Sequence, residues 1–330
     1  MFKKIIVLLL LTSSTVSAQA PILKELDSLN FVELVDKLFI DHNIENYSLR
    51  LFTNYKSKQF RISNNDFRSR YVPNNRYGVG LGFASSKILI DIAFNIKGNK
   101  EEVTNRFDLQ GTTILGKKNY INFYFQTYKG FSVKNNYGAQ KVFRDDIKSF
   151  TVGVNALHTV PEIEFSYSML KAGLSQLDKK FYITGGYGAF LFYDYFSAED
   201  DVLVDSAKLL FNEQAHIKRY NSTAVGILGG VLSVFRLPKD ITLSCNLMPG
   251  IGGVYKEVTL MDGSYKPKNH LLLKLDYSFA VGYNVDRYYL SIIYGGGLYS
   301  TDLGYDNNYA FNLTKAKIAF GYKLSGRKKK

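Results

Sequence analysis

The chain has 330 residues, of which 46% are hydrophobic and 15% aromatic, and it carries a formal net charge of +13. It contains 25 Tyr, 24 Phe and 27 Gly, but only 6 Pro, one Cys and no Trp. A single cysteine excludes an intramolecular disulfide, so the fold must be held together in another way. The cations are scattered singly between aromatic residues instead of forming one patch, which argues against a nucleic-acid partner.

The first residues have the pattern of a secretory signal peptide. Lys3 and Lys4 form a basic start, an apolar run covers residues 5–11, and small residues close the segment. The apolar run is too short to span a bilayer as a helix, which separates this pattern from that of a membrane anchor. We therefore expect a cleaved signal peptide at 1–20, followed by export.

The next segment, 21–43, has a different period. Its apolar residues recur at helical spacing, as at Leu26 and Leu29. Asn30 precedes Glu33 by three residues, which is the spacing of a helix N-cap with its reciprocal partner. The sequence predicts a short amphipathic helix as a periplasmic lead-in, with a flexible segment as the alternative. Such a helix would either plug the following domain or bind a periplasmic protein.

From residue 47 onward the apolar residues alternate with a period of two, which is the period of a β-strand with one apolar and one polar face. The clearest case is 270–284, where Leu271 and Leu273 share one face and Lys274 and Asp276 share the other. The segments predicted to be strands are 47–55, 77–84, 88–95, 103–113, 119–129, 148–157, 162–170, 180–194, 220–236, 240–256, 270–284, 287–300 and 310–324.

The connections between these segments alternate in length. Short ones are expected at 115–119, 158–162, 237–240 and 284–287, and longer polar ones at 56–76, 130–147, 195–219, 257–269 and 301–309. Outer-membrane barrels place short turns in the periplasm and longer loops outside. Strands of roughly nine or more residues match the tilted span of a bilayer, whereas strands of soluble sheets average about five or six. The pattern predicts an all-β fold, an antiparallel transmembrane β-barrel over 44–324, in the outer membrane of a Gram-negative bacterium.

The number of strands is not settled by the pattern. Thirteen segments is an odd number, whereas single-chain bacterial barrels have even numbers of strands. The segments 103–113 and 162–170 have the weakest alternation. We expect about 12 strands, with 14 as the alternative. A basic tail at 325–330 follows the last strand and is expected to be solvated in the periplasm.

The charged residues of the polar faces are the only candidate functional residues. Those expected to face the lumen are Arg50, Asp91, Glu162, Glu164, Lys274 and Asp276. Mixed signs favour either a hydrated pore or a network of ion pairs that closes the bore. The first hypothesis is a small solute channel or porin-like protein, and the alternative is a non-conducting structural or interaction barrel. Outer-membrane lipids and lipopolysaccharide are the expected counter-charges of the basic chain.

An enzyme that modifies membrane lipids is the less favoured third hypothesis. The four histidines are isolated, without the spacing of a metal site, and no Ser stands beside Asn155 and His158. The glycine runs at 78–82, 185–188 and 295–297 lack the Lys-Ser/Thr ending of a phosphate loop. We therefore assign no catalytic, cofactor-binding or metal-binding residues.

Five stretches, at 47–56, 71–75, 78–82, 108–110 and 123–130, carry a resemblance to a known group. The chain resembles the outer-membrane barrel family catalogued as domain of unknown function 4421, with collinear spacing over 44–324. The resemblance implies a barrel in the outer membrane and no assigned activity, so it carries over no catalytic residues. The last strand, with aromatic residues near its end, also resembles the signal that the outer-membrane assembly machinery recognises.

Overall fold

The computed structural model describes residues 46–84, 89–96, 101–164 and 179–325. The expected signal peptide, the expected helix at 21–43 and the tail at 326–330 lie outside the described residues. Within the described ranges, no helix is long and apolar enough to cross a membrane. The elements are β1 (Asn46–Ser63), β2 (Arg68–Val72), β3 (Tyr77–Ala84), β4 (Leu89–Asn95), β5 (Asn105–Leu115), β6 (Asn119–Asn135), β7 (Val142–Thr159), β8 (Phe181–Ser197), α5 (Asp205–Lys208), η1 (Glu213–Ala215), β9 (Ile217–Leu237), β10 (Ile241–Leu260), β11 (Ser264–Tyr265), β12 (Leu271–Val285), β13 (Tyr288–Gly304) and β14 (Asn307–Ser325).

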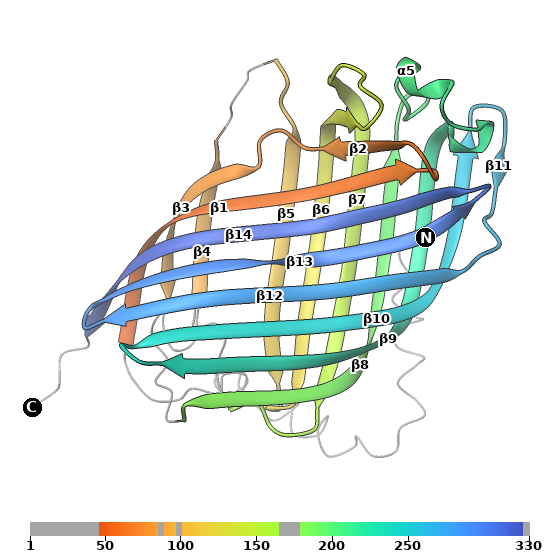
Figure 1. The fold of residues 1–330 in the computed structure, drawn as a ribbon. Coiled ribbons are helices and arrows are strands. Elements are labelled where there is room, and N and C mark those ends of the chain that lie inside the picture. The colour runs from red at the N-terminus through yellow and green to blue at the C-terminus, as the bar shows by residue number, and fades with distance from the viewer. Residues whose placement is uncertain (1–45, 85–88, 97–100, 165–178, 326–330) are drawn as a thin grey trace, which may run out of the picture.

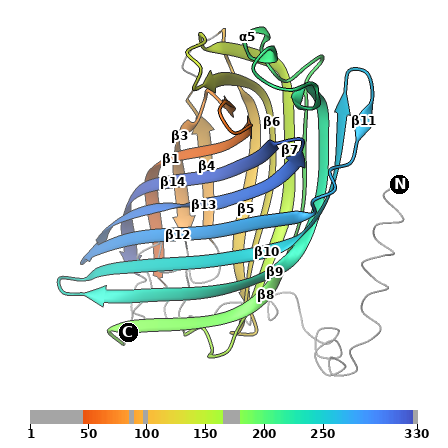
Figure 2. The ribbon, with the colours of Figure 1, turned by 45° about the vertical axis from the view of Figure 1, so that its right-hand side comes forward.

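Ten strands close into an antiparallel barrel, in the order β1, β14, β13, β12, β10, β9, β8, β7, β6 and β2 (Figures 1 and 2). The closing pair is β1 with β14, which runs from Asn46 opposite Ser325 to Ser63 opposite Asn308. On its other side β1 pairs with β2, and β2 pairs with β6. Four strands lie outside this ring: β3 and β4 extend the sheet from β1, β5 extends it from β6, and β11 pairs with β10.

The two ends of the barrel differ. The turn end carries the start of β1, the end of β14 and the tight turns after β5, β9 and β12. The loop end carries the β1–β2 turn, the connections after β6, β8 and β10, and the β13–β14 turn. The segment 198–216, with α5 and η1, is the longest of these loop-end connections and lies over the rim (Figure 1).

The all-β antiparallel barrel is confirmed, but the number of strands differs slightly from the expected twelve. Fourteen strands are present in the described residues, and ten of them close the ring. The weak segment 103–113 is a strand, β5, whereas 162–164 lies in no strand and 165–178 lies outside the described residues. The two short strands β2 and β11 fall within segments that we expected to be loops.

Several expected loops are also shorter than predicted, because the strands continue past the point where their outer face stops being apolar. The segment predicted as a connection at 56–76 begins with the last part of β1, and the one at 301–309 reduces to a turn at Tyr305 and Asp306. Both turn residues have positive φ, 54° and 61°, as a two-residue hairpin turn requires.

The polarity of the two strand faces reverses along the barrel. Near the turn end of β1, Leu51 is 61% exposed on the outer face while Arg50 is 4% exposed and faces the lumen. Near the loop end, Phe60 and Ile62 face the lumen and are buried, while Arg61 lies on the outer face. An apolar exterior is stable against lipid, and a polar exterior with an apolar interior is stable against water. The strands therefore extend beyond the apolar band into a water-facing extension at the loop end.

A charge introduced on the outer face should therefore be costly only within the apolar band. We expect Leu51→Arg to destabilise the barrel by about 2–4 kcal/mol, because an arginine on the lipid-facing side of the apolar band must be desolvated. The matched change Gln59→Arg, on the same face of β1 nearer the loop end, should cost at most about 1 kcal/mol. Urea unfolding in lipid vesicles measures both values, and equal losses would contradict the assignment of the band.

Candidate functional site in the barrel lumen

The lumen of the barrel is the place where the charged residues of the inner faces converge. Strand alternation directs polar side chains inward from every wall, and those that are buried there must find partners. In the described residues some partners lie on the same or a neighbouring strand, whereas others, such as Lys58 of β1 with Asp194 of β8 and Asn155 of β7 with Asp276 of β12, lie on strands that are not neighbours in the ring, so these contacts cross the bore. Three such networks and one aromatic cluster fill the space.

The first network is centred on an ion pair between Lys58 of β1 and Asp194 of β8. The lysine Nζ lies 2.6 Å from the carboxylate Oδ1, and neither side chain is exposed. Lys58 also donates to the hydroxyl of Ser149. Thr151 donates to Oδ1 and Tyr309 donates to Oδ2 of Asp194, each at 2.6 Å. The network therefore ties β1, β7, β8 and β14 together across the lumen.

The second network lies around Asp276 of β12. Lys274, two residues earlier on the same face, pairs with its carboxylate and donates to Asn155 Oδ1 at 2.7 Å. The amide of Asn155 donates in turn to Asp276 Oδ2 at 2.9 Å. The hydroxyl of Tyr299 donates to Asp276 Oδ1 at 3.3 Å and lies 3.0 Å from the hydroxyl of Tyr124. Side chains of β7, β12 and β13 thus meet on one carboxylate, and Tyr124 of β6 joins them through Tyr299.

The third network joins β5 to the ring through Asp108. Its carboxylate accepts hydrogen bonds from Gln126 at 2.8 Å and Tyr128 at 2.9 Å, both on β6. Lys56 of β1 lies 3.5 Å from the same carboxylate. This contact joins β1 to β5, and these two strands are not paired with each other by backbone hydrogen bonds. Side-chain charge here supplements the backbone hydrogen bonds that hold the remaining strands together.

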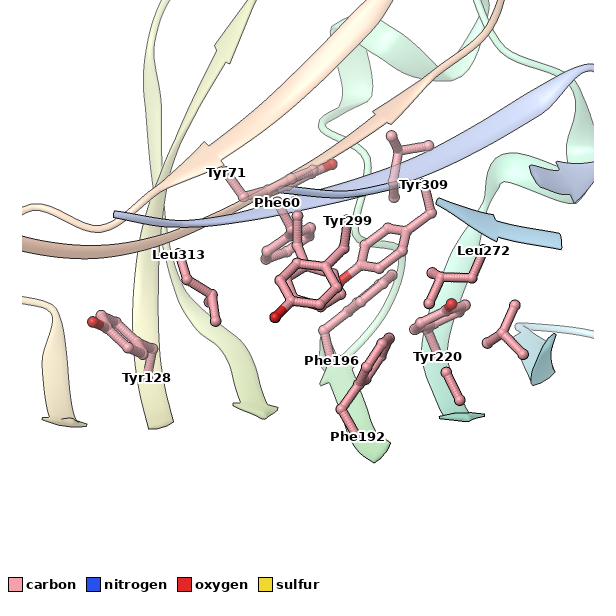
Figure 3. Packing of buried hydrophobic residues seen from close by; sticks show 14 of the residues in the cluster. Phe60, Tyr71, Tyr128, Phe192, Phe196, Tyr220, Leu272, Tyr299, Tyr309 and Leu313 are labelled. Carbon is pink, nitrogen blue, oxygen red and sulfur yellow. The ribbon is translucent and has the colours of Figure 1, made fainter. Parts of the chain in front are cut away.

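Aromatic rings fill the lumen towards the loop end (Figure 3). Phe60 stacks on Tyr71 and on Phe196, with ring centroids 4.3 and 4.8 Å apart. Tyr220 and Tyr309 lie 4.5 Å apart, and the tilted ring of Tyr309 also contacts Phe196 at 5.4 Å. The side chains come from β1, β2, β8, β9 and β14 and meet between opposite walls. Together they form part of a hydrophobic core between the walls of the barrel.

The segment 198–216 covers this core at the loop end. Its buried apolar side chains are Ala198, Val202, Leu203, Val204, Ala207, Phe211 and Ala215. The hydroxyl of Tyr71 donates to the carbonyl of Val202 at 3.0 Å. Asp201 lies 2.9 Å from His216 Nδ1, which pins the two ends of the segment together. Partial burial raises the pKa of Asp201. The hydrogen bond from the Leu203 N–H and the charge of His216 act in the opposite direction and lower this pKa, but burial has the larger effect.

Three of the six residues expected in the lumen, Arg50, Lys274 and Asp276, are buried there. The side chain of Asp91 lies outside the described set, although its backbone belongs to β4. Glu162 and Glu164 do not fit the expectation: they lie in the β7–β8 connection, are exposed, and pair with Lys117 and Lys179 at 3.8 and 2.6 Å. Pro161 precedes them, which is unfavourable for continuing a strand.

The sequence analysis missed Lys58 and Asp194. Lys58 falls in a segment that we expected to be a loop, because the outer face of β1 is polar there. Asp194 follows Phe190 and Phe192 on one face of β8 and precedes Phe196, so it is the one charge on an aromatic, buried face. A single carboxylate in such a row is the signal that would have identified it.

The pairing of Asn155 with His158, considered as part of a lipid-modifying enzyme, does not occur. Asn155 faces the lumen and binds Asp276 and Lys274. His158 is exposed at the turn end, where its Nδ1 lies 2.9 Å from Asn119 Oδ1. Because Asn155 and His158 are three residues apart on one strand, their side chains point to opposite faces of the sheet.

The central ion pair gives a direct test of the lumen network. Lys58→Met leaves a buried, uncompensated carboxylate, so we expect a loss of about 3–5 kcal/mol in the free energy of unfolding. Lys58→Met with Asp194→Leu should recover most of this loss, because no unpaired charge remains. As a control, Lys179→Met removes an exposed ion pair with Glu164 and should change the stability little. Urea unfolding of the refolded protein measures all three; equal losses in the single and double variants would contradict the pairing.

Several solved structures of outer-membrane proteins are similar to the chain at low identity. The solved structures that match include the outer membrane protease OmpT from Escherichia coli, at 10% identity, a TM-score of 0.34 and coverage of 85% of this chain and 97% of that chain. The beta domain of the Bordetella autotransporter BrkA matches at 7% identity and a TM-score of 0.34, covering 85% and 100%. The translocator domain of the autotransporter NalP from Neisseria meningitidis matches at 10% identity and a TM-score of 0.28, covering 94% and 99%.

All three TM-scores lie below 0.5, so no argument rests on these likenesses, and no curated protein matches the chain. The family model, in contrast, spans nearly all of the described barrel. Since it matches residues 34–324, the expected relationship is confirmed, and the chain belongs to the family described as Domain of unknown function (DUF4421).

Proposed function

We propose that the protein is an integral outer-membrane barrel with a closed lumen, which acts as a structural or interaction barrel and not as a solute channel. The observation that carries the proposal is the core of stacked rings and crossing ion pairs in the bore. The membrane setting is supported by the apolar outer band, with exposed leucines such as Leu49, Leu51 and Leu81.

Opening the bore would require several unfavourable steps at once. A solute would have to separate Phe60 from Phe196 and part the ion pair of Lys58 with Asp194. Breaking a buried ion pair leaves two poorly solvated charges, and separating packed rings exposes a cavity surface. These costs add along one path, because both features lie between opposite walls of the same barrel. They disfavour the porin-like alternative.

The glycines of the wall support the same conclusion. A side chain at Gly80 would collide with the ring of Phe52, and one at Gly153 would collide with the ring of Tyr124. The absence of a Cβ lets inward-pointing rings lie against the wall. Beside these two glycines, large aromatic side chains therefore fill the lumen up to the wall.

Planar-bilayer recordings test the proposal. The purified protein should insert without giving conductance steps, because the rings and the ion pair block the bore. The triple variant Phe60→Ala, Phe196→Ala, Tyr309→Ala should give steps, because it removes three interlocking rings. Its matched control, Tyr288→Ala with Phe320→Ala, removes a stacked pair from the outer face and should remain silent.

Heat-modifiable gel mobility establishes that each variant is a folded barrel before it is recorded. Regular conductance steps from the unaltered protein would overturn the closed-lumen proposal. Silence of a folded triple variant would show that the aromatic core is not what closes the bore.

A further inference from the structure

We propose that the outer face of β1, β2 and β6 at the loop end binds the phosphate groups of an outer-leaflet amphiphile, a phosphorylated glycolipid. The site is separate from the lumen and adds a ligand to the proposed function. It is carried by a row of cations, a polar cavity beneath them and an apolar groove that leads from them to the lipid-facing wall.

The cations occupy directly neighbouring positions on three strands. Arg61 of β1 lies opposite Arg70 of β2, and Arg70 lies opposite Lys134 of β6. Arg68 lies on the same face of β2 as Arg70, two residues earlier in the strand. Like charges placed opposite each other in a sheet destabilise it. A row of this kind therefore favours an anion that neutralises it.

No protein anion fills this role in the described part of the chain. Among residues 46–84, 89–96, 101–164 and 179–325, no carboxylate lies within 4.0 Å of any of the four cations. The Nε of Arg61 is buried and lacks a hydrogen-bond partner among the described residues. The nearby acid Asp66 contributes its backbone carbonyl, which accepts a hydrogen bond from Asn136. The positive charges are thus held together without internal compensation.

The cations line a cavity of about 220 Å³ together with Asn135 and Asn136. Both amides are fixed by hydrogen bonds: Asn136 accepts from the N–H of Arg68 at 2.8 Å, and Asn135 donates to the carbonyl of Ala139 at 2.9 Å. The guanidinium groups remain available. Arginine matches phosphate oxygens with paired, charge-assisted hydrogen bonds, so the chemistry of the site fits a phosphate.

A second cavity, of about 430 Å³, begins at Arg61 and Arg70 and continues along the outer wall over β14, β13 and β12. Its far part is lined by Leu273 and Leu298, which are 53% and 41% exposed. The small side chain of Ala310 lies between the two parts. An acyl chain fits this groove while its headgroup phosphate lies on the arginines.

The height of the site on the barrel selects the lipid source. The outer face of β1 is apolar at Leu49 and Leu51 and polar at Gln59 and Arg61, so the cations lie just beyond the apolar band. This is the level of lipid headgroups. In outer-membrane barrels the longer loops are extracellular, which places the site in the outer leaflet.

Native mass spectrometry of the detergent-solubilised protein, titrated with bis-phosphorylated lipid A, tests the proposal. The unaltered protein should retain one lipid, and Arg61→Gln with Arg70→Gln should weaken binding by about tenfold or more, because two charge-assisted contacts are lost. Lipid A without phosphates should bind the unaltered protein weakly. Its affinity should equal that of bis-phosphorylated lipid A for the double arginine variant. The control Lys180→Gln with Lys239→Gln removes two exposed cations at the turn end and should bind as the unaltered protein does.

A second variant keeps the charges and fills the groove. Ala310→Phe should weaken binding of the lipid while leaving the response to inorganic phosphate unchanged. Equal affinity of the arginine variant and the unaltered protein would overturn the site, as would an equal loss in the lysine control. Inorganic phosphate that binds as tightly as the lipid would overturn the assignment to an amphiphile. Heat-modifiable mobility verifies that each variant is folded.

Discussion

Every strand of a closed barrel has one face towards the lumen and one towards the exterior, and this constraint determines most of the structure. Closure of the ring depends on the pairing of β1 with β14 along the whole of both edges and on the short strand β2, which joins β1 to β6. Once the ring is closed, a period of two divides the side chains between two environments. The apolar band then sorts residues such as Leu51 outward and Arg50 inward.

The reversal of polarity near the loop end follows from the same constraint. Beyond the band both the exterior and the rim face water, so the interior becomes the place for apolar side chains. Phe60 and Ile62 face inward there, and Gln59 and Arg61 face outward. The aromatic core and the external row of cations are consequently two sides of the same part of β1. The inner side contributes Phe60 and Ile62 to the core, and the outer side carries Arg61.

The sequence was sufficient for the barrel and for most of its strands, because the alternation is strong within the apolar band. The segment 270–284 illustrates this, since its strand β12 matches the prediction within one residue at each end. The sequence was insufficient where the apolar residues change from the outer to the inner face of a strand, so the loop-end part of β1 was predicted to be a connection. The short strands β2 and β11 were missed because pairing with longer neighbours, and not their own pattern, makes them strands.

The lumen networks were predictable only in part. Lys274 and Asp276 lie two residues apart on one strand, so their proximity follows from the period alone. Lys58 and Asp194 are 136 residues apart, and they meet because β1 and β8 face each other across the ring. No local pattern contains that information, since it depends on the number and order of the strands between them. Glu162 and Glu164 were misplaced because three alternating residues after a proline imitate a strand.

The central claim is that the lumen is closed around buried charges. Amine-directed labelling of the folded protein with a small water-soluble reagent, read out by mass spectrometry at each lysine, tests it most directly. The account predicts that Lys58 and Lys274, which are 0% and 4% exposed, stay unmodified while the exposed Lys179 and Lys239 react. Modification of Lys58 at the rate of Lys179 in the folded barrel would contradict a closed lumen.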